Sequence, residues 1–205
     1  MTIRLPRGST LIVASHNPGK VREIAALVGP HGIAPVSAGD LGLAEPEETG
    51  TSFAANAQIK ALAAAAAGGH AALADDSGLC VEALDGAPGI YSARWAGPTR
   101  DFRVAMTRVQ DELRQRKLSG SPAAFVCALT LALPDGAHQT FTGTVHGRVA
   151  FPPRGERGFG YDPIFIADTM DETFAQIDPA LKHAISHRAK AFEKLLHSGI
   201  FVESL

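Results

Sequence analysis

Cysteine is scarce in this sequence, and so are long apolar runs and any excess of charge of one sign. The two cysteines, Cys80 and Cys127, lie in apolar runs without CxxC spacing, which favours buried, reduced thiols over a disulfide or a zinc site. No run approaches the roughly 20 consecutive apolar residues of a membrane span, and the start MTIRLPRGST lacks the apolar core of a signal peptide. We therefore expect a cytoplasmic protein with no membrane partner.

The balance of charge argues against one broad class of partner. The 19 Lys and Arg against 21 Asp and Glu give a formal net charge of -2, so no overall positive field attracts DNA or RNA. An anionic ligand would need a local cluster of cations or a metal ion. No nucleic-acid partner is expected.

Length and composition fit a single domain over residues 1–205. With 205 residues, 45% of them hydrophobic and 20% charged, the chain is long enough to bury a large core. No repeat and no linker rich in Pro, Ser and Gly divides it, so two independent domains are not predicted.

Short apolar runs bounded by turn residues predict the strands. Asp135-Gly136 is a typical hairpin turn between two such runs, and this hairpin is a candidate for a second lobe. Ser77-Gly78 is predicted to break another run, with 79–84 as its hairpin partner or continuation. The predicted strands are 10–15, 33–36, 70–75, 123–133 and 139–149.

Apolar residues at helical spacing, together with end signals, predict the helices. The last is the best delimited, because Asp178 is a good N-cap, Pro179 fits the first helical position and Gly199 lies just past the end. The others are 20–28, an Ala-rich helix from Thr51 or Ser52 to Gly68-Gly69, and 101–118. This mixture of strands and helices implies an α/β or α+β fold. The loop 152–162 is rich in Gly, Pro and charge, and such loops often carry binding groups.

The loop Ser15-His16-Asn17-Pro18-Gly19-Lys20 follows the first predicted strand and opens a helix. Free backbone N–H groups and the positive end of a helix favour an anion there, and Lys20 adds a full charge. The loop is not a GxxxxGK[ST] phosphate loop, and an ordinary turn capped by Ser15 or Asn17 accounts for the same residues. From these residues alone both interpretations stay open.

Two pairs of acidic residues are candidates for a metal site. Glu47-Glu48 precede the Ala-rich helix, and Asp75-Asp76 end an apolar strand, where adjacent side chains point to opposite faces. Mg²⁺ is held by one or two carboxylates together with substrate phosphate oxygens. Acids beside Ser-Gly are also common turn formers. The end of an apolar strand, where open α/β folds place ligands, favours the site.

Two cations stand out from their helices. Lys60 shares one face of the Ala-rich helix with Asn56, although a solvated lysine is the simpler interpretation of Lys60 alone. Arg188 falls on the apolar stripe of the last helix, so it needs a carboxylate or a ligand, and a structural Arg–Asp pair would satisfy it. His183 and His187 have the spacing of a zinc helix. Ala184 stands where a metalloprotease carries its Glu, so a protease is not predicted.

Six segments, taken in order, resemble the inosine triphosphate pyrophosphatase family, house-cleaning nucleotide hydrolases also described as dITP/XTP pyrophosphatases. The resemblance spans nearly the whole chain. The segments are SHNPGK at 15–20, EETGTSF at 47–53, NAQIKA at 56–61, ADDSGLCVEALDGAPGIYSARWAG at 74–97, GFGYDPIF at 158–165 and KHAISHR at 182–188.

The resemblance implies metal-assisted hydrolysis of deaminated purine nucleoside triphosphates, with at least one Mg²⁺ per subunit. Glu48 and Asp76 are the implied metal-associated carboxylates, and Asp76 is the implied general base. The implied triphosphate contacts are Ser15, His16, Asn17, Pro18, Gly19, Lys20 and Lys60, while Ser77 also touches substrate. The implied base-binding residues are Phe159, Gly160, Tyr161 and Asp162 on one wall and Lys182, His187 and Arg188 on the other.

The resemblance also implies the architecture. The expected fold is an elongated α/β structure with a central mixed sheet flanked by helices, two lobes with the active site in the cleft between them, and usually a homodimer. Ala55 departs from the family, whose members often carry an acidic residue there. That change puts a second metal site in doubt but not the main reaction.

The expected reaction converts inosine, deoxyinosine and xanthosine triphosphates to the monophosphate and pyrophosphate, which keeps these bases out of DNA and RNA. Their C6 carbonyl would accept N–H groups of Arg188 and His187, which adenine would leave unpaired. The exclusion of guanine has no visible basis in the sequence, and Phe159 is a candidate surface for stacking of the base. Two alternatives remain: a pyrophosphatase for other modified nucleotides, such as pyrimidines, and a nucleotide-binding regulatory protein without turnover.

Overall fold

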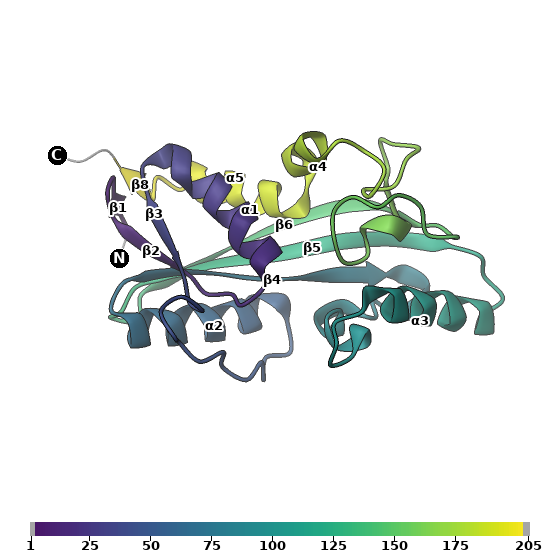
Figure 1. Cartoon of the computed structure of the whole chain (residues 1–205), viewed down its shortest axis with the longest axis horizontal. Helices are drawn as coiled ribbons and strands as arrows, with labels where there is room; N and C mark the ends of the chain where they lie inside the picture. Colours follow the sequence, from purple (N-terminus) through teal and green to yellow (C-terminus); the bar gives the residue numbers. More distant parts are fainter. Residues whose placement is uncertain (1–2, 203–205) are drawn as a thin grey trace. The chain divides into compact units, whose positions relative to one another are not determined.

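The apolar runs form strands in the computed structural model, which describes residues 3–202 (Figure 1). The strands are β1 (Leu5–Pro6), β2 (Thr10–Val13), β3 (Ala34–Ser37), β4 (Ala71–Val81), β5 (Ser121–Ala132), β6 (His138–Val149), β7 (Phe165–Ala167) and β8 (Phe201–Val202). Six of them make one sheet in the order β3-β2-β4-β5-β6-β7. Since β2 pairs in parallel with β3 and β4, while β6 and β7 are antiparallel, the predicted mixed sheet is confirmed. β1 and β8 form a separate parallel pair.

The helices begin where side chains cap them. The Oγ of Ser52 accepts from the backbone N–H of Ala55, as predicted, and Gly69 ends the same helix in the left-handed conformation. Asp101 and Asp178 cap two others. Within residues 3–202 the α-helices are α1 (Pro18–Val28), α2 (Phe53–Gly68), α3 (Phe102–Gln115), α4 (Pro179–Ile185) and α5 (His187–His197). None of these helices combines the length and the apolar character needed to cross a bilayer.

The described chain divides into two units. Unit 1 takes in the chain up to Asp76, Cys127–Gly143 and the chain from Ala189 onward, and unit 2 comprises Ser77–Val126 and Thr144–Arg188. The hairpin of β5 and β6 forms as predicted, but its residues belong to both units, so the prediction that it makes a second lobe by itself is wrong. Strands of 12 residues are long enough to contribute to two cores.

The core of unit 1 follows the two-residue period of β2. Leu11 and Val13 pack in a cluster with residues of α1 and α5, whereas Ile12 and Ala14 pack in another with the buried alanines of α2. The sheet of this unit therefore carries helices on both faces, because successive side chains of a strand alternate between them.

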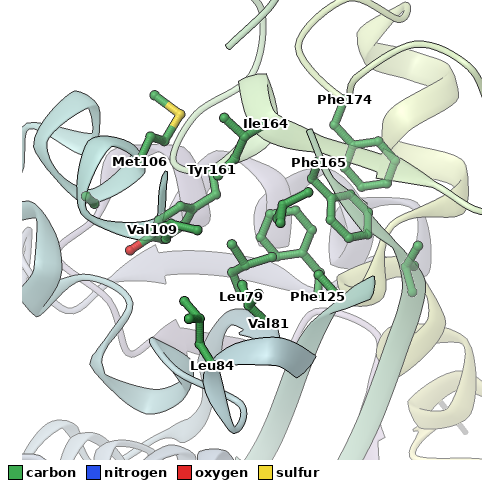
Figure 2. Packing of buried hydrophobic residues seen from close by; sticks show 14 of the residues in the cluster. Leu79, Val81, Leu84, Met106, Val109, Phe125, Tyr161, Ile164, Phe165 and Phe174 are labelled. Atoms are coloured by element: carbon green, nitrogen blue, oxygen red, sulfur yellow. The ribbon is translucent and has the colours of Figure 1, made fainter. Parts of the chain in front are cut away.

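The core of unit 2 is built largely from aromatic and aliphatic side chains (Figure 2). Leu79 and Val81 of β4 pack with Val109 of α3, and the ring of Phe125 lies 4.6 Å from that of Phe165, measured between centroids. Because these side chains are buried, the loops that connect them are held on a rigid base.

Two predictions about individual elements are wrong. Ser77-Gly78 does not break β4, which runs unbroken from Ala71 to Val81, because Gly78 does not take the positive φ of a turn. Asp75 and Asp76 therefore lie inside the strand and not at its end. The last helix is divided, because Ser186 is extended (φ -66°, ψ 157°) between α4 and α5. Leu181, expected on a continuous apolar stripe, is 46% exposed.

Candidate active site

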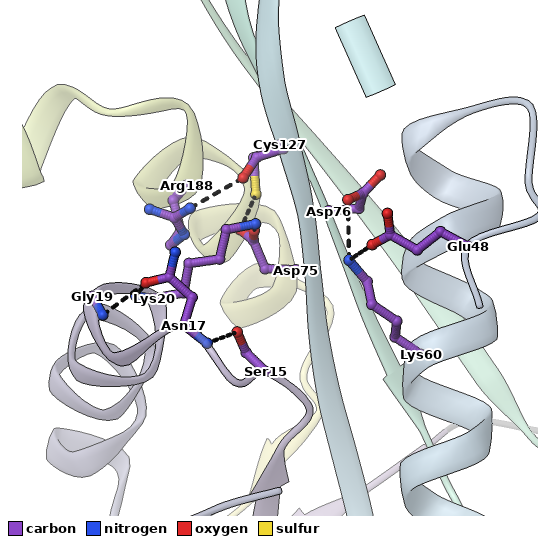
Figure 3. A network of polar contacts seen from close by, with 11 residues as sticks. Ser15, Asn17, Gly19, Lys20, Glu48, Lys60, Asp75, Asp76, Cys127 and Arg188 are labelled. Atoms are coloured by element: carbon purple, nitrogen blue, oxygen red, sulfur yellow. Dashed lines mark hydrogen bonds and ion pairs between the residues drawn. The ribbon is translucent and has the colours of Figure 1, made fainter. Parts of the chain in front are cut away.

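The side chain of Lys60 joins two carboxylates. Its ammonium lies 2.6 Å from Oε1 of Glu48 and 3.0 Å from Oδ1 of Asp76 (Figure 3). Lys60 lies on the face of α2 that the alanines bury, and it is only 6% exposed, so the solvated lysine is excluded. Burial by itself lowers the pKa of Lys60, but the charges and hydrogen bonds of Asp76 and Glu48 outweigh it and raise that pKa. The ammonium therefore stays charged.

Asp76 has one oxygen that no described protein group satisfies. Its Oδ1 accepts from Lys60, whereas its Oδ2 is buried and has no hydrogen-bond partner within residues 3–202. Burial raises the pKa of the Asp76 carboxyl, and the attraction of Lys60 and Lys20 only partly offsets this. An unsatisfied buried oxygen costs free energy. A hard cation beside Glu48 and Asp76 would satisfy it, and such ions choose carboxylate oxygens.

Asp75 points to the opposite face of β4, as predicted for adjacent strand residues (Figure 3). Its Oδ1 lies 2.5 Å from the ammonium of Lys20, and its Oδ2 accepts from the thiol of Cys127 at 3.0 Å. Of the two cysteines predicted to be buried, Cys127 is buried and Cys80 is partly so. The contact with Asp75 could not be predicted, because an apolar run does not reveal which residue of a neighbouring strand a thiol faces.

The loop from Ser15 to Lys20 connects β2 to α1 and is braced by its own side chains. The Oδ1 of Asn17 accepts from the backbone N–H groups of Gly19 and Lys20 at 2.9 and 3.3 Å, and Oγ of Ser15 accepts from the N–H of Asn17 (Figure 3). Asn17 is thus the helix cap, and Pro18 is the first helical residue. The capped N–H groups already have a partner and the Lys20 ammonium is shared with Asp75, so an anion here would meet the helix dipole and the donors of that ammonium that Asp75 does not use.

The segment that carries Glu48 lies between β3 and α2. The Nε2 of His16 lies 3.0 Å from the carbonyl oxygen of Leu43, so His16 contacts this segment from the loop after β2. Farther along the segment, the backbone N–H of Gly50 donates to Oδ1 of Asn56. Asn56 lies one turn of α2 before Lys60. The sequence placed Asn56 and Lys60 on one face of the helix, and the structure confirms that placement.

In unit 2 the carboxylate of Asp162 closes the loop that begins at Gly158. Its Oδ2 accepts from the backbone N–H of Phe159 at 2.8 Å and from the ammonium of Lys182 at 2.6 Å. Gly158 has a φ of +75°, and a Cβ on it would meet this carboxylate. The Lys182 ammonium also lies 4.6 Å from the ring centroid of Phe159. The loop and α4 are therefore joined through one buried charge pair.

The side chains of this loop point in different directions. Phe159 is 37% exposed, so its ring is available to a ligand. The Tyr161 side chain is buried, its hydroxyl donates to the carbonyl oxygen of Ser92 at 2.8 Å, and burial raises the pKa of that hydroxyl. Gly160, between them, has a φ of +69°. Any contact of Tyr161 with a ligand would come from its backbone.

His187 and Arg188 open α5 and are both buried. The His187 ring stacks on Phe125, with centroids 4.9 Å apart and planes 13° from parallel. Arg188 is 2% exposed, and its Nη2 donates to Oγ of Ser77 at 3.2 Å. The sequence did not reveal the stack on Phe125, because a phenylalanine in an apolar strand reads as ordinary core.

The residues predicted from the sequence are divided between the two units and make several separate contacts in each. Within residues 3–202, no three His, Cys, Asp or Glu side chains come together as a metal site, so the carboxylate pair would need ligands from a substrate or water. Unit 1 holds Ser15, His16, Asn17, Pro18, Gly19, Lys20, Glu48, Lys60 and Asp76, and unit 2 holds Ser77, Phe159, Gly160, Tyr161, Asp162, Lys182, His187 and Arg188.

Comparisons with known proteins agree with the predicted resemblance. The model of the Ham1 family matches residues 11–198. A dITP/XTP pyrophosphatase of Rhodospirillum centenum is 60% identical over 190 residues, which cover 92% of this chain and 94% of the relative. A dITP/XTP pyrophosphatase of Zymomonas mobilis is 58% identical over 187 residues, which cover 91% of this chain and 90% of that relative.

Solved structures give the same result. A HAM1 protein from Coxiella burnetii superposes with a TM-score of 0.84 at 38% identity, covering 91% of this chain and 96% of that one. A dITP/XTP pyrophosphatase from Mycobacterium abscessus superposes with a TM-score of 0.72 at 40% identity, covering 91% of this chain and 98% of that one.

Proposed function

This chain belongs to the Ham1 family, and from that premise we propose that it hydrolyses deaminated purine nucleoside triphosphates to the monophosphate and pyrophosphate. The substrates are inosine, deoxyinosine and xanthosine triphosphates, and the cleaved bond joins the α and β phosphates. The observation that carries the proposal is the pair of carboxylates on Lys60, one of which keeps a buried oxygen without a donor within residues 3–202.

Glu48 and Asp76 are the residues that would hold Mg²⁺, at least one ion per subunit. The unsatisfied Oδ2 of Asp76 fits a cation, and two carboxylates agree with the one or two that Mg²⁺ takes together with phosphate oxygens. The ion, when bound, lowers the pKa of water and offsets the charge repulsion between the phosphates and the attacking oxygen.

Asp76 is the proposed general base. It takes a proton from water as the water oxygen bonds to the α phosphorus and the bond to the β phosphate breaks. An Asp with an ordinary pKa near 3.9 is a weak base, but burial raises the pKa of Asp76 and so strengthens it. Lys60, held charged, and Lys20 neutralise the leaving pyrophosphate.

The proposed base-binding residues come from unit 2. Arg188 and His187 offer N–H groups to the C6 carbonyl, and the exposed ring of Phe159 offers a stacking surface. Lys182 and Asp162 hold the loop that carries this ring.

Three further properties belong to the same proposal. The enzyme acts on the nucleotide pool from which DNA and RNA are made, so we place it in the cytoplasm. We expect a homodimer, as the resemblance implies. We also expect the two units to fold as one domain, since the chain passes between them after Asp76, Val126, Gly143 and Arg188.

Pyrophosphate release from inosine, xanthosine, guanosine and adenosine triphosphates with Mg²⁺ tests the function. We expect fast release from the first two and pyrophosphate as the first product. Orthophosphate alone would refute the proposal, and equal rates on all four would refute the selectivity. A faster reaction with modified pyrimidine nucleotides would favour the first alternative. Tight binding of inosine triphosphate without metal-dependent turnover would favour the regulatory protein.

A further inference from the structure

Glu48 is carried by a segment that has no helix or strand. After β3 ends at Ser37, regular structure resumes only at Phe53. The ion pair with Lys60 fixes the Glu48 carboxylate but not the backbone behind it. A metal ligand must be held within a few tenths of an ångström of its place to keep its affinity. A contact that holds the backbone near Glu48 would therefore help to keep this carboxylate in place.

Asn56 provides that anchor. Its side chain is 1% exposed, and its Oδ1 accepts from the backbone N–H of Gly50 at 2.8 Å. Asn56 and Lys60 are four residues apart on α2, so one helix face holds the segment twice. Asn56 holds its backbone at Gly50, and Lys60 holds its carboxylate at Glu48.

Gly50 lets the segment approach α2 this closely. A Cβ on residue 50 would lie 2.6 Å from Oδ1 of Asn56, 2.8 Å from Cβ of Ala55 and 2.9 Å from the backbone nitrogen of Asn56. The last two atoms belong to the first turn of a packed helix and cannot move away. Any side chain at residue 50 would therefore push the segment off the helix and carry Glu48 with it.

We propose that the hydrogen bond between Gly50 and Asn56 positions Glu48, and thereby sets how tightly the Glu48–Asp76 pair binds a divalent cation. Asn56 is then a positioning residue, acting through Glu48. The inference rests on the proposed function for the identity of the metal ligands. It adds a determinant of metal affinity outside the residues that touch the ion.

Direct binding of Mn²⁺ in the absence of nucleotide, measured by electron paramagnetic resonance, is the main test. Groups that hold a metal ligand in place are typically worth 10- to 100-fold in affinity. We expect Asn56→Ala to bind Mn²⁺ about 10-fold more weakly, and its half-saturating Mg²⁺ concentration in turnover to rise by a similar factor. Its kcat at saturating Mg²⁺ should stay near that of the wild type, because the ligands themselves are intact.

Four further variants sharpen the test. Gln58→Ala is the matched control, since it removes another side-chain hydrogen bond of α2, from Nε2 of Gln58 to Oγ1 of Thr140, and should leave Mn²⁺ affinity unchanged. Asn56→Asp keeps the acceptor for Gly50 and should restore most of the affinity. Gly50→Ala should weaken Mn²⁺ binding as Asn56→Ala does. The double variant should bind Mn²⁺ no more weakly than the weaker-binding single variant, because both substitutions break the same contact.

Wild-type Mn²⁺ affinity in a folded Asn56→Ala protein would overturn the inference. The inference would also fail if the losses of Mn²⁺ affinity in the two single variants added up fully in the double variant. An equal loss of Mn²⁺ affinity in Gln58→Ala would overturn it as well. If Asn56→Ala does not fold, Gly50→Ala and hydrogen exchange at the amide of residue 50 decide the question. Failure of the proposed function is distinguishable: a wild type that binds Mn²⁺ but releases no pyrophosphate refutes the reaction and leaves the positioning result intact. A wild type that binds no Mn²⁺ refutes the inference.

Discussion

Replacing Asp76 with Asn removes the charge and the basicity of the site while keeping its shape. The amide oxygen can still accept from Lys60, which also keeps its ion pair with Glu48 at 2.6 Å. Asn cannot take a proton from water, and it is a poorer ligand for a hard cation. The substitution therefore affects chemistry and folding in opposite ways.

The activity should fall about 1,000-fold in kcat/KM, within the 10²- to 10⁴-fold range of a general base. That loss corresponds to roughly 4 kcal/mol of transition-state stabilisation at 1.36 kcal/mol per factor of ten. The wild type should also gain stability from Mg²⁺, about 2.7 kcal/mol at 100 times the dissociation constant, and the variant should gain clearly less.

Without metal, the free energy of unfolding should not fall in Asp76→Asn as the activity does. Burial raises the pKa of Asp76, so the protonated carboxyl stabilises the folded state at low pH, and this contribution is lost as the pH rises through the folded pKa. At pH 7 the charge of Asp76 therefore costs stability. We expect Asp76→Asn without metal to be at least as stable as the wild type at pH 7, with the difference shrinking toward pH 4.

Pyrophosphate release with inosine triphosphate and urea unfolding with and without Mg²⁺ measure these effects on the same preparations. A variant that keeps more than a tenth of the wild-type kcat/KM would refute Asp76 as the base. Loss of activity together with loss of metal-free stability would mean that the substitution damages the fold, and would refute the argument from the raised pKa.

Three other outcomes are expected. Lys60→Met removes a charge that lowers the pKa of Asp76, so the acid limb of the pH profile of kcat/KM should move to higher pH; an unchanged limb would contradict the pairing. Tyr161→Phe removes the buried hydrogen bond to Ser92 and should cost about 1–2 kcal/mol in urea unfolding with little change in kcat, whereas a large fall in kcat would place its hydroxyl in the chemistry. Thermal unfolding should show one transition by calorimetry, because the chain passes repeatedly between the units, and two separate transitions would exclude a single domain.

The elements with local end signals could be predicted from the sequence. Ser52 and Gly69 delimit α2, and Asp135-Gly136 delimits the β5–β6 hairpin, because a cap or a tight turn depends on neighbouring residues alone. The strands β1, β7 and β8 were missed. They have only two or three residues each, and strands so short form because a partner strand from a distant part of the chain pairs with them.

The break at Ser186 lies beyond local prediction. Residues on both sides favour a helix, and the Oγ of Ser186 donates to the carbonyl oxygen of His183 in the turn before it. The break affects the candidate site, because His187 and Arg188 are the first two residues of α5 and do not lie in the middle of a longer helix. The residues were predicted from the resemblance, but their placement on the backbone was not.

The burial of Lys60 was missed for a different reason. Helix α2 has alanines on nearly every side, so its sequence shows no polar face from which to decide which residues are exposed. Packing against the sheet decides it, and the carboxylates that make the burial tolerable come from Glu48 and Asp76, 12 and 16 residues away. The burial of Lys60 therefore depends on residues distant in the sequence and could not be predicted from its neighbours.

The pleat of β4 gives two adjacent aspartates different partners, and this supports the proposal of Asp76 as the base. Asp75 has a protein partner for each oxygen, Lys20 for one and the Cys127 thiol for the other, so its charge is already balanced. Asp76, on the opposite face, shares Lys60 with Glu48 and keeps one buried oxygen without a described donor. A cation or a water proton is taken most easily where an oxygen is left, so the geometry favours the proposed role of Asp76 over the same role for Asp75. The sequence could place the two acids on opposite faces of the strand, but only the structure shows which partners each carboxylate has.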